Sequence, residues 1–257
     1  MEFLLPHTSY APLDAAVFDF DGTLSGLRAG WEGVMGPLMC RLIPGEPAEV
    51  RALVDRYIDE STGIQTIHQM RWLAEEIERR GGRPEDPWTY KDEYNRLLMQ
   101  EVQRRRDAVE SGEEPAEAYR IPGGIEFLTA LREGGAALYA ASGTDTADVR
   151  EEARVLGLDG FFAGIRGAER NTDRCSKEAV LRDLVRPGLR LLVVGDGKVE
   201  IALGREAGAL TLGIASQDVP GCASHALNMQ KYRRLKAAGA HAVTADFAEW
   251  REILSWI

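Results

Sequence analysis

Cysteine is scarce in this chain, with three residues, Cys40, Cys175 and Cys222, among 257. They stand far apart, form no Cys-x-x-Cys pair and have no histidine at zinc-finger spacing. This pattern argues against a disulfide-stapled scaffold and against a cysteine-based zinc domain. We therefore expect reduced thiols and a cytoplasmic location.

A surplus of basic residues and long apolar runs are lacking as well. The sequence has 31 basic and 41 acidic residues, a formal net charge of −10 and a pI near 5.1. A general nucleic-acid binder needs extra lysine and arginine to neutralise phosphates, so we expect no nucleic-acid partner. No segment approaches the ~20 apolar residues that span a bilayer and no secretion signal is recognisable, so we expect no membrane partner.

The sequence does contain enough apolar material for a folded protein of one or two domains. Hydrophobic residues make up 44% of the chain, and a chain of this length can bury a core without disulfides or metals. From about Leu24 to Tyr119, apolar residues recur at three- and four-residue intervals, which predicts a compact helical insert. The clearest repeats are Val50, Leu53, Val54 and Tyr57; Ile64, Ile67, Met70, Leu73 and Ile77; and Tyr94, Leu97, Leu98 and Val102.

Short apolar strands stand on both sides of this insert. Strands are expected over residues 15–21, 136–141, 189–194, 209–214 and 240–244, and helices over about 125–131, 149–156, 179–185 and 199–207. Fully apolar strands separated by helices indicate a parallel sheet covered on both faces. We predict an α/β fold, a Rossmann-like parallel sheet with an inserted all-helical segment.

Polar residues stand where three of these strands end. Asp19 and Asp21 follow the first strand, Ser142 and Gly143 the second, and Asp196 a later one, with Glu200 one helical turn further on. In open parallel sheets, ligands bind outside the carboxyl ends of the strands. Because clustered carboxylates repel one another, a magnesium ion is the simplest compensation, and Lys177 would add a fixed positive charge. Phosphoryl transfer requires a nucleophile, a cation on the phosphate oxygens, further donors and an acid for the leaving oxygen, and a carboxylate can serve as the nucleophile.

Each motif has a simpler interpretation when it is taken alone. Asp21-Gly22 could form a hairpin turn, Ser142-Gly143 a helix cap, Lys177 a solvated helix lysine and Asp196-Gly197 another turn. The segment after Gly22 does not alternate as a returning strand does, and this glycine comes too early for an EF-hand loop. No dinucleotide-binding glycine motif and no Walker loop is present. The occurrence of all four motifs together favours phosphate chemistry.

These residues resemble the haloacid dehalogenase superfamily, whose phosphatases carry Asp-x-Asp-Gly-Thr after the first strand. The matching residues are Asp19-Phe20-Asp21-Gly22-Thr23, then Ser142, Lys177, and Gly195-Asp196 with Glu200, in the order of the family. The stretches 121–128, 156–162 and 194–209 resemble the family too. The resemblance implies a family-like core over residues 1–23 and 120–257 and a helical cap of the first type over residues 24–119.

The resemblance also implies roles for the matching positions. Asp19 would be the nucleophile and Asp21 the general acid and base. Mg²⁺ would be held by Asp19, the backbone carbonyl of Asp21 and Asp196, with Glu200 supporting it directly or through water, and Ser142, Gly143 and Lys177 would contact the phosphate. The implied activity is magnesium-dependent hydrolysis of a small phosphomonoester, a sugar phosphate or similar metabolite, through an aspartyl-phosphate.

In the family, polar side chains of the cap select the substrate. The candidates here are Arg28 and Trp31, just after the first motif, and Gln65 and His68, near Thr66 and Arg71. Trp31 and His68 can also be interpreted as partly buried residues of the cap core.

The same residues bear on other activities of the superfamily. Asp21 argues against the dehalogenases, which do not use an acid there, and against phosphonate hydrolysis, in which a small residue replaces this acid. A Schiff-base reaction would have to use Lys91, which is the only lysine of the insert, and nothing else in the sequence supports it. A phosphosugar mutase would use the same aspartate pair, so the motifs do not separate it from a phosphatase. A non-catalytic binding or regulatory module is expected to have a broken catalytic set, whereas the set is complete here.

Overall fold

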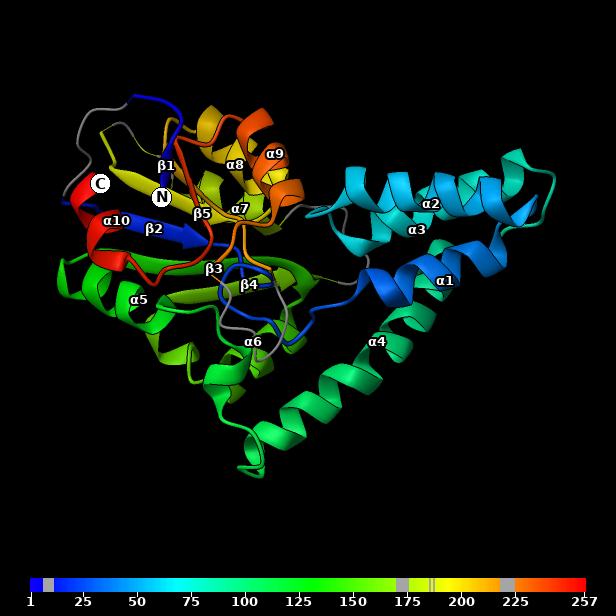
Figure 1. Ribbon diagram of the computed structural model, residues 1–257, viewed down its shortest axis with the longest axis horizontal. Helices are drawn as coiled ribbons and strands as arrows, with labels where there is room; N and C mark the ends of the chain where they lie inside the picture. Colours follow the sequence, from blue (N-terminus) through cyan, green and yellow to red (C-terminus); the bar gives the residue numbers. More distant parts are fainter. Residues whose placement is uncertain (7–11, 170–175, 185, 187, 218–224) are drawn as a thin grey trace. The chain divides into compact units, whose positions relative to one another are not determined.

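A computed structural model of the chain describes residues 1–6, 12–169, 176–184, 186, 188–217 and 225–257. The chain divides into two compact units (Figure 1). The sheet unit consists of Met1–Ala29 and Ala108–Ile257, and the helical unit of Gly30–Asp107. Residues 24–29 and 108–119 thus group with the sheet unit, and the cap domain expected over 24–119 remains a prediction.

Within its described residues, the sheet unit contains one sheet of seven strands in the order β1-β7-β6-β5-β2-β3-β4. Every neighbouring pair is parallel except β1 and β7, as the near-continuous apolar strands predict. The strands are β1 (Glu2–Phe3), β2 (Ala15–Phe18), β3 (Ala137–Asp145), β4 (Gly164–Ala168), β5 (Leu191–Gly195), β6 (Leu210–Ile214) and β7 (Ala242–Thr244).

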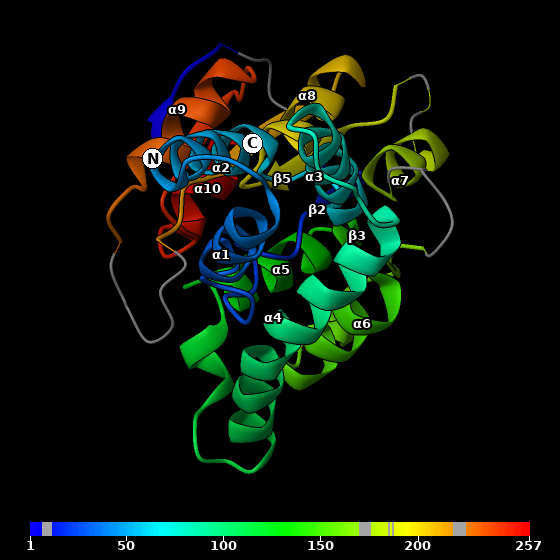
Figure 2. The same ribbon diagram turned by 90° about the vertical axis from the view of Figure 1, so that its right-hand side faces the viewer.

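Both faces of the sheet are covered by helices. Along β2, Ala16 and Phe18 join one apolar cluster with Phe127, whereas Ala15 and Val17 join another on the opposite face. The predicted α/β fold with a buried parallel sheet is confirmed. Figures 1 and 2 show α5 and α6 on one side of the sheet and α8 and α9 on the other. The helices are α5 (Gly124–Glu133), α6 (Thr146–Val155), α7 (Ser176–Leu184), α8 (Lys198–Glu206), α9 (Met229–Ala237), α10 (Trp250–Trp256), and the short 3₁₀ helices η1 (Ala116–Tyr119) and η2 (Asp159–Phe161).

The strand order places β2 between β3 and β5. The chain runs from β2 outward to β3 and β4, and then returns to β5 on the other side of β2. Such a reversal creates a crevice at the carboxyl ends of the central strands, where ligands bind in open α/β sheets. The strand-end residues predicted from the sequence therefore belong to one edge of the sheet.

The helical unit has an apolar core of its own. Most residues of the three apolar repeats lie in α2, α3 and α4 and pack in this core, whereas Ile64 precedes α3, so these helix predictions are confirmed. The rings of Tyr57 and Trp72 stack with their centroids 3.6 Å apart. The helices are α1 (Glu32–Leu42), α2 (Pro47–Ser61), α3 (Thr66–Arg79) and α4 (Pro87–Glu110), the last of which extends three residues beyond this unit.

Three local expectations differ from the structure. Residues 24–31 form turns instead of helix, with Gly30 at φ +85°, and Leu24 and Leu27 are buried in the core of the sheet unit. Strand β3 continues past residue 141 because its end pairs with β4 after a register shift. Strand β4 and helix α9 were not expected: Gly164 and Gly167 weaken the strand pattern of β4, and charged residues dominate α9.

The remaining sequence expectations concern thiols and membranes. Cys40 is a free thiol, while Cys175 and Cys222 lie outside the described residues. In the part of the chain that the structure describes, none of the helices has the length and apolar character needed to cross a bilayer.

Candidate active site

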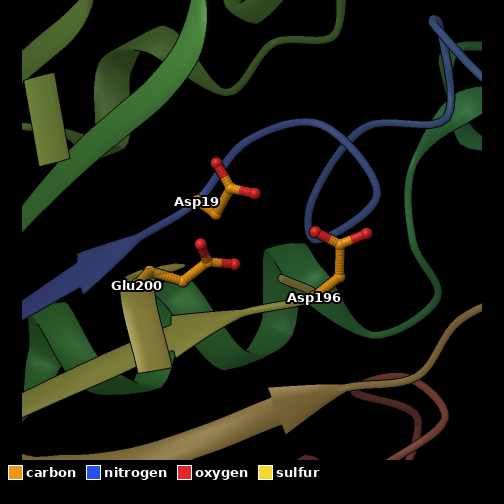
Figure 3. Close-up of side chains that lie close together, drawn as sticks. All are labelled: Asp19, Asp196 and Glu200. Atoms are coloured by element: carbon orange, nitrogen blue, oxygen red, sulfur yellow. The ribbon is translucent and has the colours of Figure 1, made fainter. Parts of the chain in front are cut away.

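Three carboxylates meet at the carboxyl ends of β2 and β5. Asp19 directly follows β2, Asp196 directly follows β5, and Glu200 lies in the first turn of α8. Each contributes a carboxylate oxygen within 4.8 Å of the other two, and all three residues are buried. Figure 3 shows the three side chains close together. The arrangement brings together three residues that the sequence analysis had selected.

Two glycines of the predicted motifs make this close approach possible. Gly22 has a φ of +74°, and a Cβ atom there would lie 2.2 Å from Oδ2 of Asp196. A Cβ atom on Gly195 would lie 2.2 Å from Cγ of Glu200. Any other residue would displace a carboxylate at either position, so the backbone itself forms part of the wall of the site.

Lys177 bridges two of these carboxylates from the start of α7. Its Nζ lies 3.0 Å from Oδ1 of Asp19 and 2.7 Å from Oε2 of Glu200. Burial tends to lower the pKa of Lys177, but the two carboxylates outweigh burial and raise it above its ordinary value. Burial raises the pKa of Asp19 well above its usual range; Lys177 opposes this shift and the neighbouring carboxylates add to it. The lysine thus supplies the local positive charge that Asp19 needs to be ionised.

Glu200 has a second local contact. Its Oε1 accepts a 2.6 Å hydrogen bond from the backbone N–H of Gly197, which caps the N-terminus of α8. Since Oε2 is bound to Lys177, both oxygens accept hydrogen bonds from the protein. Each carboxylate oxygen has two lone pairs, so Glu200 can still support a cation.

Asp21 is held by hydroxyl groups from β3. Its Oδ2 accepts hydrogen bonds from Oγ of Ser142 at 3.0 Å and from Oγ1 of Thr144 at 2.8 Å. The backbone N–H of Thr144 donates to Oγ of Ser142, which directs the serine hydrogen toward Asp21. Oδ1 of Asp21 is buried and accepts no hydrogen bond from the described residues. Gly143 lies between the two hydroxyl residues in β3.

Arg28 lies beside Asp21 but forms its closer ion pairs with two other acids. Its Nη2 is 2.6 Å from Oε1 of Glu152 and 3.3 Å from Oδ2 of Asp148, whereas its Nε is 3.8 Å from Oδ1 of Asp21. Burial raises the pKa of Glu152 to about 7, and Arg28 opposes this shift. Arg28, a candidate for substrate contact from the sequence, therefore belongs to the sheet unit and forms a buried pair there.

A second lysine, Lys231 of α9, reaches Asp196. Its Nζ lies 2.7 Å from Oδ2 of Asp196 and donates a 3.1 Å hydrogen bond to Oγ of Ser216. Ser216 in turn donates a 2.6 Å hydrogen bond to the carbonyl of Gly22. This chain of contacts joins α9, the segment after β6 and the loop after β2 around one carboxylate.

The other sequence candidates lie in the helical unit. Trp31 precedes α1, Gln65 is buried at the N-terminus of α3, and His68 is half-buried in the first turn of that helix. The backbone N–H of His68 donates to the carbonyl of Gln65 at 3.0 Å. Their role in substrate contact remains a prediction.

Four residues of the site were not predicted from the sequence, namely Thr144, Glu152, Ser216 and Lys231. The sequence does contain a signal for two of them, namely a charged residue at an inward position of a helix. Glu152 falls between the buried Val149 and Ala153 in α6, and Lys231 shares the buried face of α9 with Leu235. A charged side chain among buried positions needs an oppositely charged or hydrogen-bonding group, and this makes it a candidate for a functional site.

The oxygen atoms of the site suit a divalent cation. The carboxylates of Asp19, Asp196 and Glu200 contact two ammonium groups, those of Lys177 and Lys231, and one net negative charge remains when all five groups are counted as charged. The donors are all oxygen atoms, which suit Mg²⁺ and not a soft metal. The residues present therefore fit the magnesium ion that the sequence resemblance implies.

Comparison with protein families agrees with this geometry. The family model of the haloacid dehalogenase-like hydrolases matches residues 13–208. The chain belongs to the haloacid dehalogenase-like hydrolase family. The matched range includes every strand-end residue from Asp19 to Glu200, whereas Ser216 and Lys231 lie beyond it.

Solved structures of haloacid dehalogenase-like proteins share the fold at low sequence identity. A phosphonoacetaldehyde hydrolase-like protein from Oleispira antarctica has a TM-score of 0.66 at 17% identity, over 98% of this chain and 95% of the other. A β-phosphoglucomutase from Clostridium difficile has a TM-score of 0.65 at 14% identity, over 95% and 96%. A predicted phosphoglycolate phosphatase from Haemophilus somnus has a TM-score of 0.61 at 16% identity, over 96% and 99%. These likenesses establish the fold, and comparison with curated sequences finds no match.

Proposed function

We propose that the protein is a magnesium-dependent phosphomonoester hydrolase that forms an aspartyl-phosphate on Asp19. The observation that carries the proposal is the pairing of two different carboxylates at one strand end. Asp19 is buried in contact with Lys177, whose positive charge stabilises the ionised form that a nucleophile needs. Asp21, two residues later, is held by neutral hydroxyl groups, which suits a group that donates and then accepts a proton.

The reaction follows in two steps. A carboxylate oxygen of Asp19 forms a bond to phosphorus while the bond between phosphorus and the ester oxygen breaks, and Asp21 gives its proton to that departing oxygen. Asp21 then takes a proton from water, whose oxygen attacks phosphorus and displaces the Asp19 carboxylate, so that inorganic phosphate is released. Lys177 stabilises the negative charge on the nucleophile and on the phosphoryl group throughout.

The proposed cation site uses Asp19, Asp196 and the backbone carbonyl of Asp21, with Glu200 in support. When bound, Mg²⁺ would withdraw negative charge from the phosphoryl oxygens. Ser142 and the backbone of Gly143 are proposed to bind the phosphate. In the structure Ser142 donates to Asp21, so a bound phosphate oxygen would compete with Asp21 for this hydrogen.

The proposed substrate is a small phosphorylated metabolite, such as a sugar phosphate. The helical unit is proposed to act as the cap that selects it, through Trp31, Gln65 and His68. Arg28 is proposed to take part from the sheet unit, where Glu152 fixes its guanidinium group.

The test is phosphate release from a panel of phosphorylated metabolites, with and without Mg²⁺, by the native protein and by Asp19→Asn. We expect magnesium-dependent release that falls by about 10⁴-fold or more in Asp19→Asn. Asp183→Asn, which changes an aspartate in an exposed ion pair with Arg166, serves as the matched control and should retain full activity. Unchanged release by Asp19→Asn would refute the mechanism, and an isomerised sugar phosphate without free phosphate would identify a mutase instead.

A further inference from the structure

Lys231 is a buried lysine that the proposed reaction does not use. It lies outside the range matched by the family model and comes from α9, whose other lysine, Lys236, is exposed. Lysine is rarely buried to this extent unless an opposite charge compensates it, and here 5% of the residue is exposed. Its ion-pair partner at 2.7 Å is Asp196, one of the carboxylates of the proposed cation site.

The surroundings of Lys231 fix the position of its charge. Ser216 donates its hydrogen to the carbonyl of Gly22, and its Oγ accepts a hydrogen bond from Lys231. The ammonium group is thus held between a carboxylate and a hydroxyl oxygen that is itself oriented by the loop after β2. A carboxylate has two oxygens, so Asp196 can bind Lys231 through Oδ2 and a metal ion through Oδ1 at the same time.

We propose that Lys231 is a built-in counter-cation that weakens magnesium binding at Asp196 and stabilises the acidic cluster when no metal is bound. This inference rests on the proposed magnesium site. Without Lys231, Asp196 would lose this ammonium group, and the cluster of Asp19, Asp196 and Glu200 would have a stronger attraction for a divalent cation. With Lys231, part of the charge that a metal would neutralise is already compensated by the protein.

The experiment measures Mg²⁺ binding to the full-length protein by isothermal titration calorimetry, without substrate. Lys231→Gln keeps a hydrogen-bond donor beside Asp196 but removes the charge, and Lys231→Arg keeps the charge. We expect Lys231→Gln to bind Mg²⁺ roughly tenfold more tightly, about 1.4 kcal/mol, and to unfold at a lower temperature than the native protein when Mg²⁺ is absent. Lys231→Arg and the exposed control Lys236→Gln should bind Mg²⁺ as the native protein does.

The outcomes separate this inference from the proposed function. Equal or weaker binding by Lys231→Gln, with measurable binding by the native protein, would overturn the role of Lys231 and leave the magnesium site intact. A Lys231→Gln protein that folds only after Mg²⁺ is added would support the proposal, and one that stays unfolded at any Mg²⁺ concentration would overturn it. Absence of Mg²⁺ binding by the native protein would overturn the proposed cofactor itself, and this inference with it.

Discussion

The two sides of the candidate active site compensate their carboxylates in different ways. One side, named the metal side for its proposed role, consists of Asp19, Asp196, Glu200, Lys177 and Lys231, and its lysines contact the carboxylates directly at 2.7–3.0 Å. The other, named the acid/base side for its proposed role, consists of Asp21, Ser142, Thr144, Arg28 and Glu152, and there Arg28 pairs with Glu152 and stays 3.8 Å from Asp21. Direct hydrogen bonds to Asp21 come from hydroxyl groups instead.

This difference corresponds to what each side must do in the proposed reaction. Contact with a lysine stabilises the ionised form of a carboxylate, which is the form a nucleophile or a metal ligand needs, and Lys177 thereby opposes the burial that raises the pKa of Asp19. A carboxylate bound by hydroxyl groups can gain or lose a proton without breaking an ion pair. Arg28 lies 3.8 Å from Asp21 and forms closer ion pairs with Glu152 and Asp148. In the proposed reaction, one side therefore holds carboxylates beside lysines, and the other side transfers the proton.

The largest effect should come from Asp21→Asn, which removes the proton donor but leaves Asp19 in place. For an alkyl phosphate, whose leaving oxygen needs a proton, we expect the first turnover to slow by about 10³-fold. For p-nitrophenyl phosphate, whose leaving group departs as an anion, the first turnover should slow much less. Rapid-quench measurement of the released alcohol or phenol compares the two substrates.

The same measurement on Asp19→Asn provides the contrast. Loss of the nucleophile should slow both substrates equally. An equal loss for both substrates in Asp21→Asn would contradict the assignment of proton transfer to the acid/base side.

Next in size is the stability cost of Lys177→Met, measured by urea unfolding without Mg²⁺. The substitution leaves Asp19 and Glu200 buried without their shared cation, and we expect the free energy of unfolding to fall by about 3 kcal/mol. The control is Arg166→Met, which breaks the exposed pair with Asp183 and should cost less than about 0.5 kcal/mol. Similar losses of unfolding free energy in the two variants would show that the stability of the metal side does not depend on Lys177.

A pH dependence should arise on the acid/base side from Glu152. Burial raises its pKa from an ordinary value of 4.5 to about 7, against the opposing charge of Arg28 and with Asp21 and Asp148 adding to the shift. Between these two pH values the folded protein binds more protons than the unfolded chain, so the free energy of unfolding falls as the pH rises. We expect this fall, on the order of 2 kcal/mol, in the native protein and not in Glu152→Gln.

Urea unfolding at pH 4.5, 5.5, 6.5 and 7.5 measures the slope for both proteins. The other ionisable groups are shared, so the difference between the slopes isolates Glu152. Parallel curves would mean that Arg28 keeps Glu152 ionised throughout, and the acid/base side would then resemble the metal side.

The sequence predicted the metal side better than the acid/base side. Asp19 and Asp196 stand at the ends of apolar strands, where a carboxylate has no structural reason, and the parallel sheet brings such ends together. Thr144 gives no comparable signal, because a threonine is ordinary in a strand and its partner Asp21 is 123 residues away. Its contact depends on how far β3 extends, which the strand pattern placed too early.

Lys231 and Glu152 were missed for a different reason. Helix α9 contains many charged residues, so the sequence pattern predicts a solvated segment. The spacing of Lys231 from Leu235 is a weak signal by itself, and the packing of α9 against β6 and β7 shows which of its lysines faces inward. The fold could thus be predicted from strand and helix patterns, whereas these ion pairs depend on the rotation of single helices.

The smallest expected effect tests one hydroxyl group on the acid/base side. Thr144→Val keeps the β-branched shape that suits β3 and removes one of the two donors to Oδ2 of Asp21. One hydrogen bond contributes about 1 kcal/mol, so the first turnover of an alkyl phosphate should slow by roughly five- to tenfold and that of p-nitrophenyl phosphate by much less. The matched control is Thr146→Val, whose hydroxyl group contacts the backbone of Gly167 and Ala168 and should not alter the ratio between the two substrates. If Thr144→Val slowed both substrates alike, the hydroxyl group would act on the phosphate or on the fold, and Asp21 would rely on Ser142 alone.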